Sequence, residues 1–162
     1  MSEKQIDFIR LNIPAKPEYV GIARLAVSGV ANRMGFSYDE IEDMKLAVAE
    51  ACTNAVDHAY CGGDGEIEVA CKIFSDRIQV DVMDRGNSFD ISEIDERTGP
   101  ITHQSSLNAV RERGLGLYLM KTLMDDVDIQ LDQGVVVTMT KFIRKDVVES
   151  YGISPSSHQT NR

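Results

Sequence analysis

Apolar and polar positions along the chain recur with two different periods. Over residues 9–13 they alternate, which predicts a half-buried strand. Over 17–35 and 37–60 the apolar positions instead recur at helical spacing, which predicts two consecutive helices. Ser37 and Glu40 have the spacing of a capping box, so we expect the second helix to begin there.

The rest of the patterned sequence predicts a strand pair, a third helix and a second strand pair, at 67–73, 78–82, 117–124, 127–131 and 135–139. A Ser75-Asp76 turn separates the first pair. Residues 87–113 show no periodicity and form a longer connection than is usual, so we expect a functional lid or a disordered insertion there. This order favours an α+β fold, with helices over one face of a mixed, mostly antiparallel sheet.

Length and composition indicate one folded domain. The chain has 162 residues, of which 43% are hydrophobic and 27% are charged. We expect the domain over 1–145, followed by a polar tail over 146–162 that frays. No signal peptide or long apolar run is seen, which favours a cytoplasmic protein with no membrane contact.

The formal net charge of −9, with no basic run, argues against direct binding to nucleic acid. The three cysteines give no disulfide framework and no Cys-x-x-Cys pair. Cys52 and Cys71 fall within apolar patterns and are interpreted as core residues, whereas Cys61 falls in a turn as a candidate exposed thiol.

Glu50, Asn54 and His58 form a polar stripe on the second predicted helix, because they are spaced four residues apart. A carboxylate and a carboxamide one turn apart offer oxygen ligands of the kind that Mg²⁺ accepts. Mg²⁺ usually takes one or two protein ligands and completes its shell with water and phosphate, so this pair is sufficient. The spacing alone is more typical of an ordinary solvated polar stripe on an amphipathic helix.

Asp84-Arg85-Gly86 ends the second strand of the first pair. The carboxylate there suits an acceptor at the edge of a pocket, and the glycine allows the chain to turn or a ligand to approach. The same tripeptide is also an ordinary turn.

A third segment, residues 111–116, enters the third predicted helix with the sequence Arg-Glu-Arg-Gly-Leu-Gly. Glycines at a helix N-terminus leave N–H groups free to hold phosphate, and Arg111 and Arg113 add charge-assisted donors. It is not a Walker motif, because no Gly-Lys-Ser/Thr follows, and a Gly-x-Gly alone is a weak signal.

The order of these motifs resembles that of the GHKL ATPase family, over roughly residues 8–144. The motifs are, in order, the Glu-x-x-x-Asn-x-x-x-His stripe, Asp84-x-Gly86, a lid and Gly114-x-Gly116. The resemblance implies the Bergerat fold, an α/β sandwich in which ATP lies between helices and sheet. It departs from the family pattern at Ser88, where many relatives have a second glycine, which puts that part of the lid hinge in doubt.

The resemblance also implies roles for single residues. Asn54 would coordinate Mg²⁺, and Glu50 would act as the base or position the phosphoryl acceptor. Asp84 would accept a hydrogen bond from the adenine amino group, with Gly86 beside it. The backbone N–H groups of Gly114, Leu115 and Gly116 would hold the phosphates, and Thr138 would support the aspartate near adenine. His58 would pack or form a hydrogen bond to a residue behind the site, with direct contact to phosphate as the alternative.

The size of the domain and two stretches, at 17–25 and 38–56, resemble the serine kinases that double as anti-sigma factors in Gram-positive bacteria, the general-stress member above all. That resemblance implies a homodimer with two partners. The protein would sequester a sigma-B-type sigma factor and would use Mg-ATP to phosphorylate an anti-anti-sigma protein on serine. Arg24 is a candidate partner contact or a solvated position. The alternative is a non-catalytic, ATP-gated sequestration module.

Overall fold

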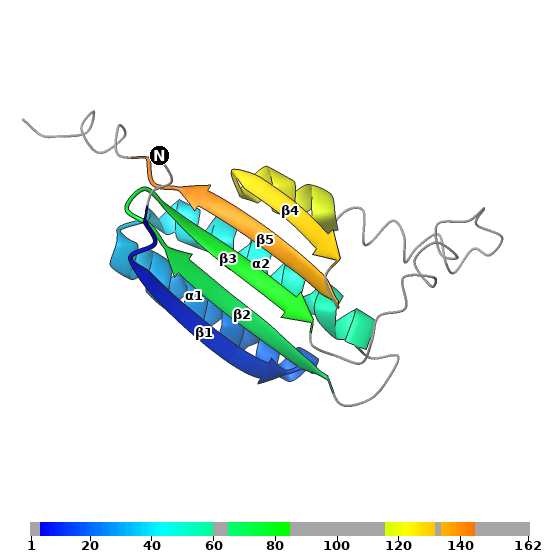
Figure 1. The fold of residues 1–162 in the computed structure, drawn as a ribbon. Coiled ribbons are helices and arrows are strands. Elements are labelled where there is room, and N and C mark those ends of the chain that lie inside the picture. The colour runs from blue at the N-terminus through cyan, green and yellow to red at the C-terminus, as the bar shows by residue number, and fades with distance from the viewer. Residues whose placement is uncertain (1–3, 60–64, 85–115, 132–133, 145–162) are drawn as a thin grey trace, which may run out of the picture.

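The computed structural model describes residues 4–59, 65–84, 116–131 and 134–144. Five strands form one sheet in the order β1-β2-β3-β5-β4 (Figure 1). They are β1 (Asp7–Pro14), β2 (Glu66–Ile73), β3 (Arg77–Asp84), β4 (Asp126–Leu131) and β5 (Val135–Phe142). All four pairings are antiparallel, so the α+β prediction is confirmed and the described sheet has no parallel pair.

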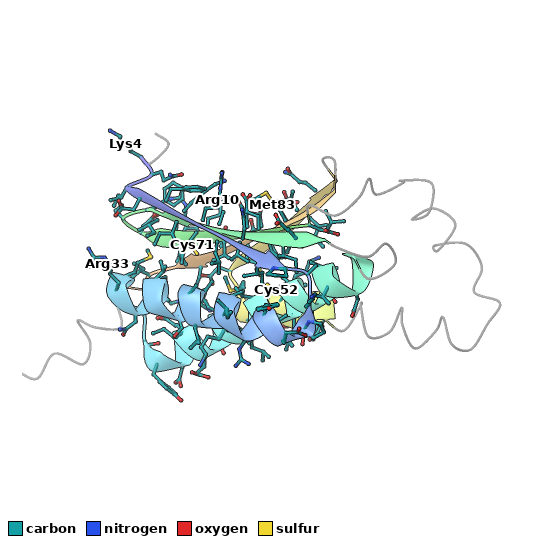
Figure 2. The ribbon with its side chains drawn as sticks, turned by 90° about the horizontal axis from the view of Figure 1, so that it is seen from below. Lys4, Arg10, Arg33, Cys52, Cys71 and Met83 are labelled. Atoms are coloured by element: carbon teal, nitrogen blue, oxygen red, sulfur yellow. The ribbon has the colours of Figure 1, made fainter. Side chains whose placement is uncertain are left out.

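Within the described residues, three helices cover one face of this sheet. They are α1 (Val20–Met34), α2 (Tyr38–Ala59) and a helix over 116–123, and Figure 2 shows them as a layer below the strands. A short 3-10 turn, η1 (Pro17–Tyr19), precedes α1, so the proline begins a turn that leads into the helix. None of the described helices is long and apolar enough to cross a bilayer.

The boundary between α1 and α2 follows from local chemistry. Gly35 ends α1 with a φ of 91°, a left-handed conformation that favours glycine. Two residues later the predicted capping box is formed, because the Ser37 N–H donates to Glu40 Oε2 at 2.8 Å and the Glu40 N–H donates to Ser37 Oγ at 3.2 Å. The two helices are therefore joined by a short, well-defined turn.

The core lies between the helices and the inner face of the sheet. Period-two alternation points the apolar residues of β2, β3 and β5 toward the helices, where α2 contributes a continuous buried stripe. Cys52 and Cys71 lie between the two layers, and Arg10 and Met83 lie on the opposite face of the sheet (Figure 2). The buried members include Val27, Met44, Ala47, Val48, Ala51, Ile67, Val69, Ile78, Val80, Val82, Met120 and Met139.

Candidate active site

The polar stripe of α2 meets the first described residue of the helix over 116–123. A Cβ at Gly116 would lie 3.2 Å from Glu50 Oε2 and 3.6 Å from Asn54 Nδ2. Glu50 and Asn54 are both half-buried, so they lie at the border of the core and within reach of solvent. Residues that are distant in sequence and were predicted separately as site candidates are thus brought together, and a Cβ at residue 116 would require the Glu50 carboxylate to move by a few tenths of an ångström.

A cavity of about 220 Å³ lies beside this contact, between α2, the helix over 116–123 and strands β3, β4 and β5. Its walls are apolar, and its polar side chains are Asn54 and Asp84. This volume is below the roughly 300–1,000 Å³ of sites that enclose a whole ligand, so it suits one flat ring system. The lining residues are Ala51, Asn54, Ala55, Val82, Asp84, Leu117, Met120, Ile129, Val135 and Val137.

Asp84 is held at the end of β3 by a close approach of the chain at Gly134. Asp84 is 8% exposed and faces the cavity. Gly134 has a φ of 145°, and a Cβ there would lie 2.5 Å from the Asp84 carbonyl oxygen. Any side chain at residue 134 would therefore displace Asp84 or the start of β5, which makes Gly134 part of the site's framework.

The structure contradicts the prediction for Thr138. In the β3–β5 register Thr138 pairs with Asp81, whereas the adjacent pair, Val82 and Val137, lines the cavity. Successive side chains of a strand point to opposite faces, so Thr138 lies on the outer face, away from Asp84. The β5 side chains that line the cavity are those of Val135 and Val137.

Cys52 and Cys71 are core residues, as predicted. Cys52 and Cys71 are free and buried. Burial raises the pKa of Cys52 from 9.0 to about 12, and burial with the nearby Asp81 carboxylate raises the pKa of Cys71 to about 11. Both remain protonated at neutral pH, so neither is a nucleophile for a reaction at Glu50 and Asn54.

Several predicted residues lie outside the described part of the chain. They are Gly86, Arg111, Arg113, Gly114 and Leu115, together with Cys61, Ser88, the lid over 87–113 and the tail over 146–162. His58 lies in the last turn of α2, and its side chain is also outside the description. Their assigned roles remain predictions.

Sequence reasoning missed the apolar walls of the cavity and the role of Gly134. Leu117, Met120 and Ile129 belong to patterns that predict core packing, and nothing in those patterns separates a cavity wall from a filled core. Gly134 had a weaker signal, the Gln133-Gly134 turn before β5, which indicates a special backbone conformation but not its neighbour.

Comparison with known proteins agrees with this geometry. A family model described as a histidine kinase-like ATPase domain matches residues 13–141. The serine-protein kinase RsbW of Bacillus licheniformis is 48% identical over 161 residues, which covers 98% of this chain and 99% of the relative. RsbW of Bacillus subtilis strain 168 is 49% identical, with 96% and 97% covered.

A solved structure of the RsbU and RsbW domains of a Mycobacterium tuberculosis protein has the same fold. It matches with a TM-score of 0.60 at 20% identity and covers 86% of this chain and 33% of that one. The family predicted from the motifs is thereby confirmed. The chain belongs to the histidine kinase-like ATPase domain family and, within it, to the RsbW serine-protein kinases.

Proposed function

We propose that this chain is a serine-protein kinase and anti-sigma factor. It transfers a phosphoryl group from Mg-ATP to a serine of an anti-anti-sigma protein, and it holds a sigma-B-type sigma factor inactive. The observation that carries the proposal is the meeting of Glu50 and Asn54 with Gly116, beside an apolar cavity that ends on Asp84. The high identity to serine-protein kinases along nearly the whole chain supports the same activity.

The cavity fits the base of ATP. Its apolar walls match the faces of a purine ring, and the Asp84 carboxylate accepts a hydrogen bond from an exocyclic amino group. Ile129 is 43% exposed, so the cavity has a side from which the ribose and phosphates can extend. The phosphates then lie toward Gly116, where Asn54 is within reach.

The donor set near Gly116 fits Mg²⁺ bound through phosphate. The described residues contain no cluster of three or more His, Cys, Asp or Glu side chains that would hold a metal without a ligand. Mg²⁺ takes one or two protein oxygens and completes its shell with water and phosphate, a requirement that Asn54 Oδ1 satisfies. When bound, the metal supplies neutralisation of charge on the transferring phosphoryl group.

Glu50 is the base in this proposal. Its carboxylate accepts the hydrogen bond, and then the proton, of the acceptor serine hydroxyl. The serine oxygen forms its bond to the γ-phosphorus while the bond from that phosphorus to the β–γ bridging oxygen breaks, and ADP leaves. The half-buried position of Glu50 leaves its carboxylate within reach of a serine supplied by a second protein.

Replacing Asn54 and Glu50 separately tests the division of roles. Asn54→Ala is expected to weaken Mg-ATP binding by about 100-fold in calorimetry, because the metal loses its protein ligand. Glu50→Ala is expected to keep binding but lose transfer of labelled phosphate to the anti-anti-sigma protein. Asp57→Ala, which removes an exposed carboxylate from the same helix, serves as the control. Tight Mg-ATP binding by Asn54→Ala would contradict the metal assignment.

The competing function is a sequestration module that binds ATP without catalysis. A labelled-ATP assay with the anti-anti-sigma protein separates the two. Serine phosphate on the partner supports the kinase. ATP binding with no phosphoserine on the partner leaves only sequestration.

The exposed face of α1 supports the proposal of a partner surface around Arg24. Arg24 is exposed, and its neighbours Ile22 and Leu25 are 46% and 71% exposed. Exposed apolar side chains beside a charge are typical of an interaction site. Arg24→Ala is expected to weaken binding of both partners, with the exposed Arg33→Ala on the same helix as the control. Unchanged binding by Arg24→Ala would remove this surface from the proposal.

Two further parts of the proposal concern assembly and location. The chain acts in the cytoplasm as a homodimer, without direct contact to nucleic acid. Analytical ultracentrifugation over a range of concentrations tests the dimer, and a sedimentation coefficient of a monomer at micromolar concentration would contradict it.

A further inference from the structure

The helix over 116–123 fixes two parts of the site at once. Its first described residue, Gly116, lies against Glu50 and Asn54, and Leu117 and Met120 form part of the cavity wall. A shift of this helix along its axis would therefore change both the contact with α2 and the shape of the cavity. The contacts at the C-terminal end of the helix hold it in place.

Lys141 on β5 binds the C-terminal end of this helix. Its Nζ donates a hydrogen bond to the Leu123 carbonyl oxygen at 2.7 Å, and the residue is 8% exposed. A lysine is rarely this buried, and the last four carbonyls of a helix have no partner within the helix. The cation thus satisfies a free carbonyl and also complements the negative end of the helix dipole.

Asp125 adds a second tie between the same two elements. Its N–H donates to the Thr140 carbonyl oxygen at 2.9 Å, and its Oδ2 accepts from the Phe142 N–H at 2.7 Å. Leu123 and Asp125 are therefore both bound to the last part of β5, on either side of Met124. We call Lys141 and Asp125 together the β5 clamp.

We propose that the β5 clamp is a positioning device for nucleotide binding, with Lys141 as its main residue. At 1.5 Å per residue the eight-residue helix is about 12 Å long, so the clamp acts on Gly116 from the other end of a short helix. Lys141 touches neither Glu50 nor Asn54 in this arrangement, and it acts through the helix. The inference rests on the proposed function, because it assigns the ATP site to Glu50, Asn54 and the cavity.

The reason for expecting a rigid connection is the packing of the helix. Met120 and Met124 are 1% and 4% exposed, and the Met124 N–H continues the helical hydrogen bonds by donating to the Met120 carbonyl. A helix bound at its end and packed along its side moves as one unit. Loss of the Lys141 hydrogen bond should thus shift the whole helix, including Gly116, and not only unwind its last turn.

The test measures binding of a non-hydrolysable ATP analogue to the full chain by calorimetry, together with thermal unfolding. Lys141→Met, which keeps the length of the side chain and removes the donor, is expected to weaken binding by about tenfold or more. Lys141→Arg, which restores a cationic donor, is expected to recover most of the affinity. Lys121→Met removes an exposed lysine from the same helix and is expected to bind like the parent.

Affinity of Lys141→Met equal to that of the parent, at a temperature where both are folded, would overturn the proposal. A loss that Lys141→Arg does not recover would also overturn it, because it would assign the effect to packing around residue 141. Asp125→Ala tests the clamp without replacing a buried residue and is expected to weaken binding about threefold. An unchanged affinity in Asp125→Ala would remove Asp125 from the clamp, and it would overturn the proposal if Lys141→Met cannot be folded.

These measurements separate the clamp from the proposed function. If the parent binds the analogue but phosphorylates no partner, the kinase proposal fails while the clamp is still tested by affinity. If the parent phosphorylates its partner and Lys141→Met binds ATP normally, the clamp fails alone.

Discussion

Replacing Gly134 with alanine tests how Asp84 is held at the cavity. The added Cβ would lie 2.5 Å from the Asp84 carbonyl oxygen, whereas carbon and oxygen atoms in contact normally lie at least about 3.3 Å apart. The end of β3 or the start of β5 must therefore move by about 0.8 Å, the difference between these two distances. Since Asp84 and Val135 both line the cavity, either movement changes its shape.

The structure sets the size of the expected effect on binding and on stability. A hydrogen bond from the adenine amino group to the Asp84 carboxylate would lengthen from about 2.9 Å to about 3.7 Å, outside the normal range. Loss of a hydrogen bond to a charged group costs about 1.5–3 kcal/mol, or about 10- to 100-fold in the dissociation constant. The φ of 145° adds backbone strain of about 1–3 kcal/mol to the free energy of folding.

Calorimetry with a non-hydrolysable ATP analogue and thermal unfolding measure the two effects separately. Gly35→Ala is the matched control, because Gly35 also has a positive φ, of 91°, but no atom within 4 Å of its Cβ position. We expect Gly35→Ala to lose stability and keep the parent's affinity. Affinity of Gly134→Ala within twofold of the parent's, measured well below its melting temperature, would refute the assigned role of Asp84.

Three further predictions follow from the geometry of the described residues. In Gly116→Ala the new Cβ lies 3.2 Å from Glu50 Oε2, so we expect the rate of serine phosphorylation to fall about tenfold, measured at saturating ATP; an unchanged rate would contradict the position of Glu50. In Gly29→Ala nothing lies within 4 Å of the new Cβ, so the free energy of unfolding should rise by about 0.5–1 kcal/mol in chemical denaturation. Burial raises the pKa of Cys52 and Cys71 to about 12 and about 11, so the thiols of the unfolded chain lose their protons at lower pH than those of the folded chain. The free energy of unfolding should therefore fall as pH rises above about 9, by up to about 1.4 kcal/mol per pH unit per thiol. This fall should be shallower in Cys52→Ala.

Local patterns predicted the elements of the fold well, because each pattern has a direct physical cause. The hydrogen bonds between Ser37 and Glu40 follow from residue types that satisfy free N–H groups at a helix start. The order of the strands in the sheet, in contrast, does not follow from local patterns. Alternation in β5 shows which face is buried but not that β5 pairs with β3 as well as with β4. Pairing across a long connection depends on how the intervening chain packs, which no local pattern contains.

At the site, too, some features could be predicted from the local sequence and others could not. Glu50 and Asn54 were predicted from spacing and family resemblance, and the structure brings them against Gly116. Thr138 was assigned from the family resemblance, and that assignment did not take strand parity into account. Since Val135, Val137 and Met139 alternate as core-facing residues, residue 138 must face the other way. The signal needed to exclude Thr138 was therefore present in the sequence.

Strand parity also shows that β5 contacts both the cavity and the C-terminal end of the helix over 116–123. Val135, Val137 and Lys141 all face the helices, the first two at the cavity and the third at the end of the helix over 116–123. A change at Gly134 should therefore weaken adenosine and ATP binding by similar factors, because it alters the cavity that is proposed to hold the base. Lys141→Met should weaken ATP binding several-fold more than adenosine binding, because in the proposal the clamp positions Gly116, toward which the phosphates lie. Competition calorimetry gives, for each variant, the ratio between the loss of ATP affinity and the loss of adenosine affinity. Equal ratios in the two variants would show that Gly134 and Lys141 do not affect different parts of the site.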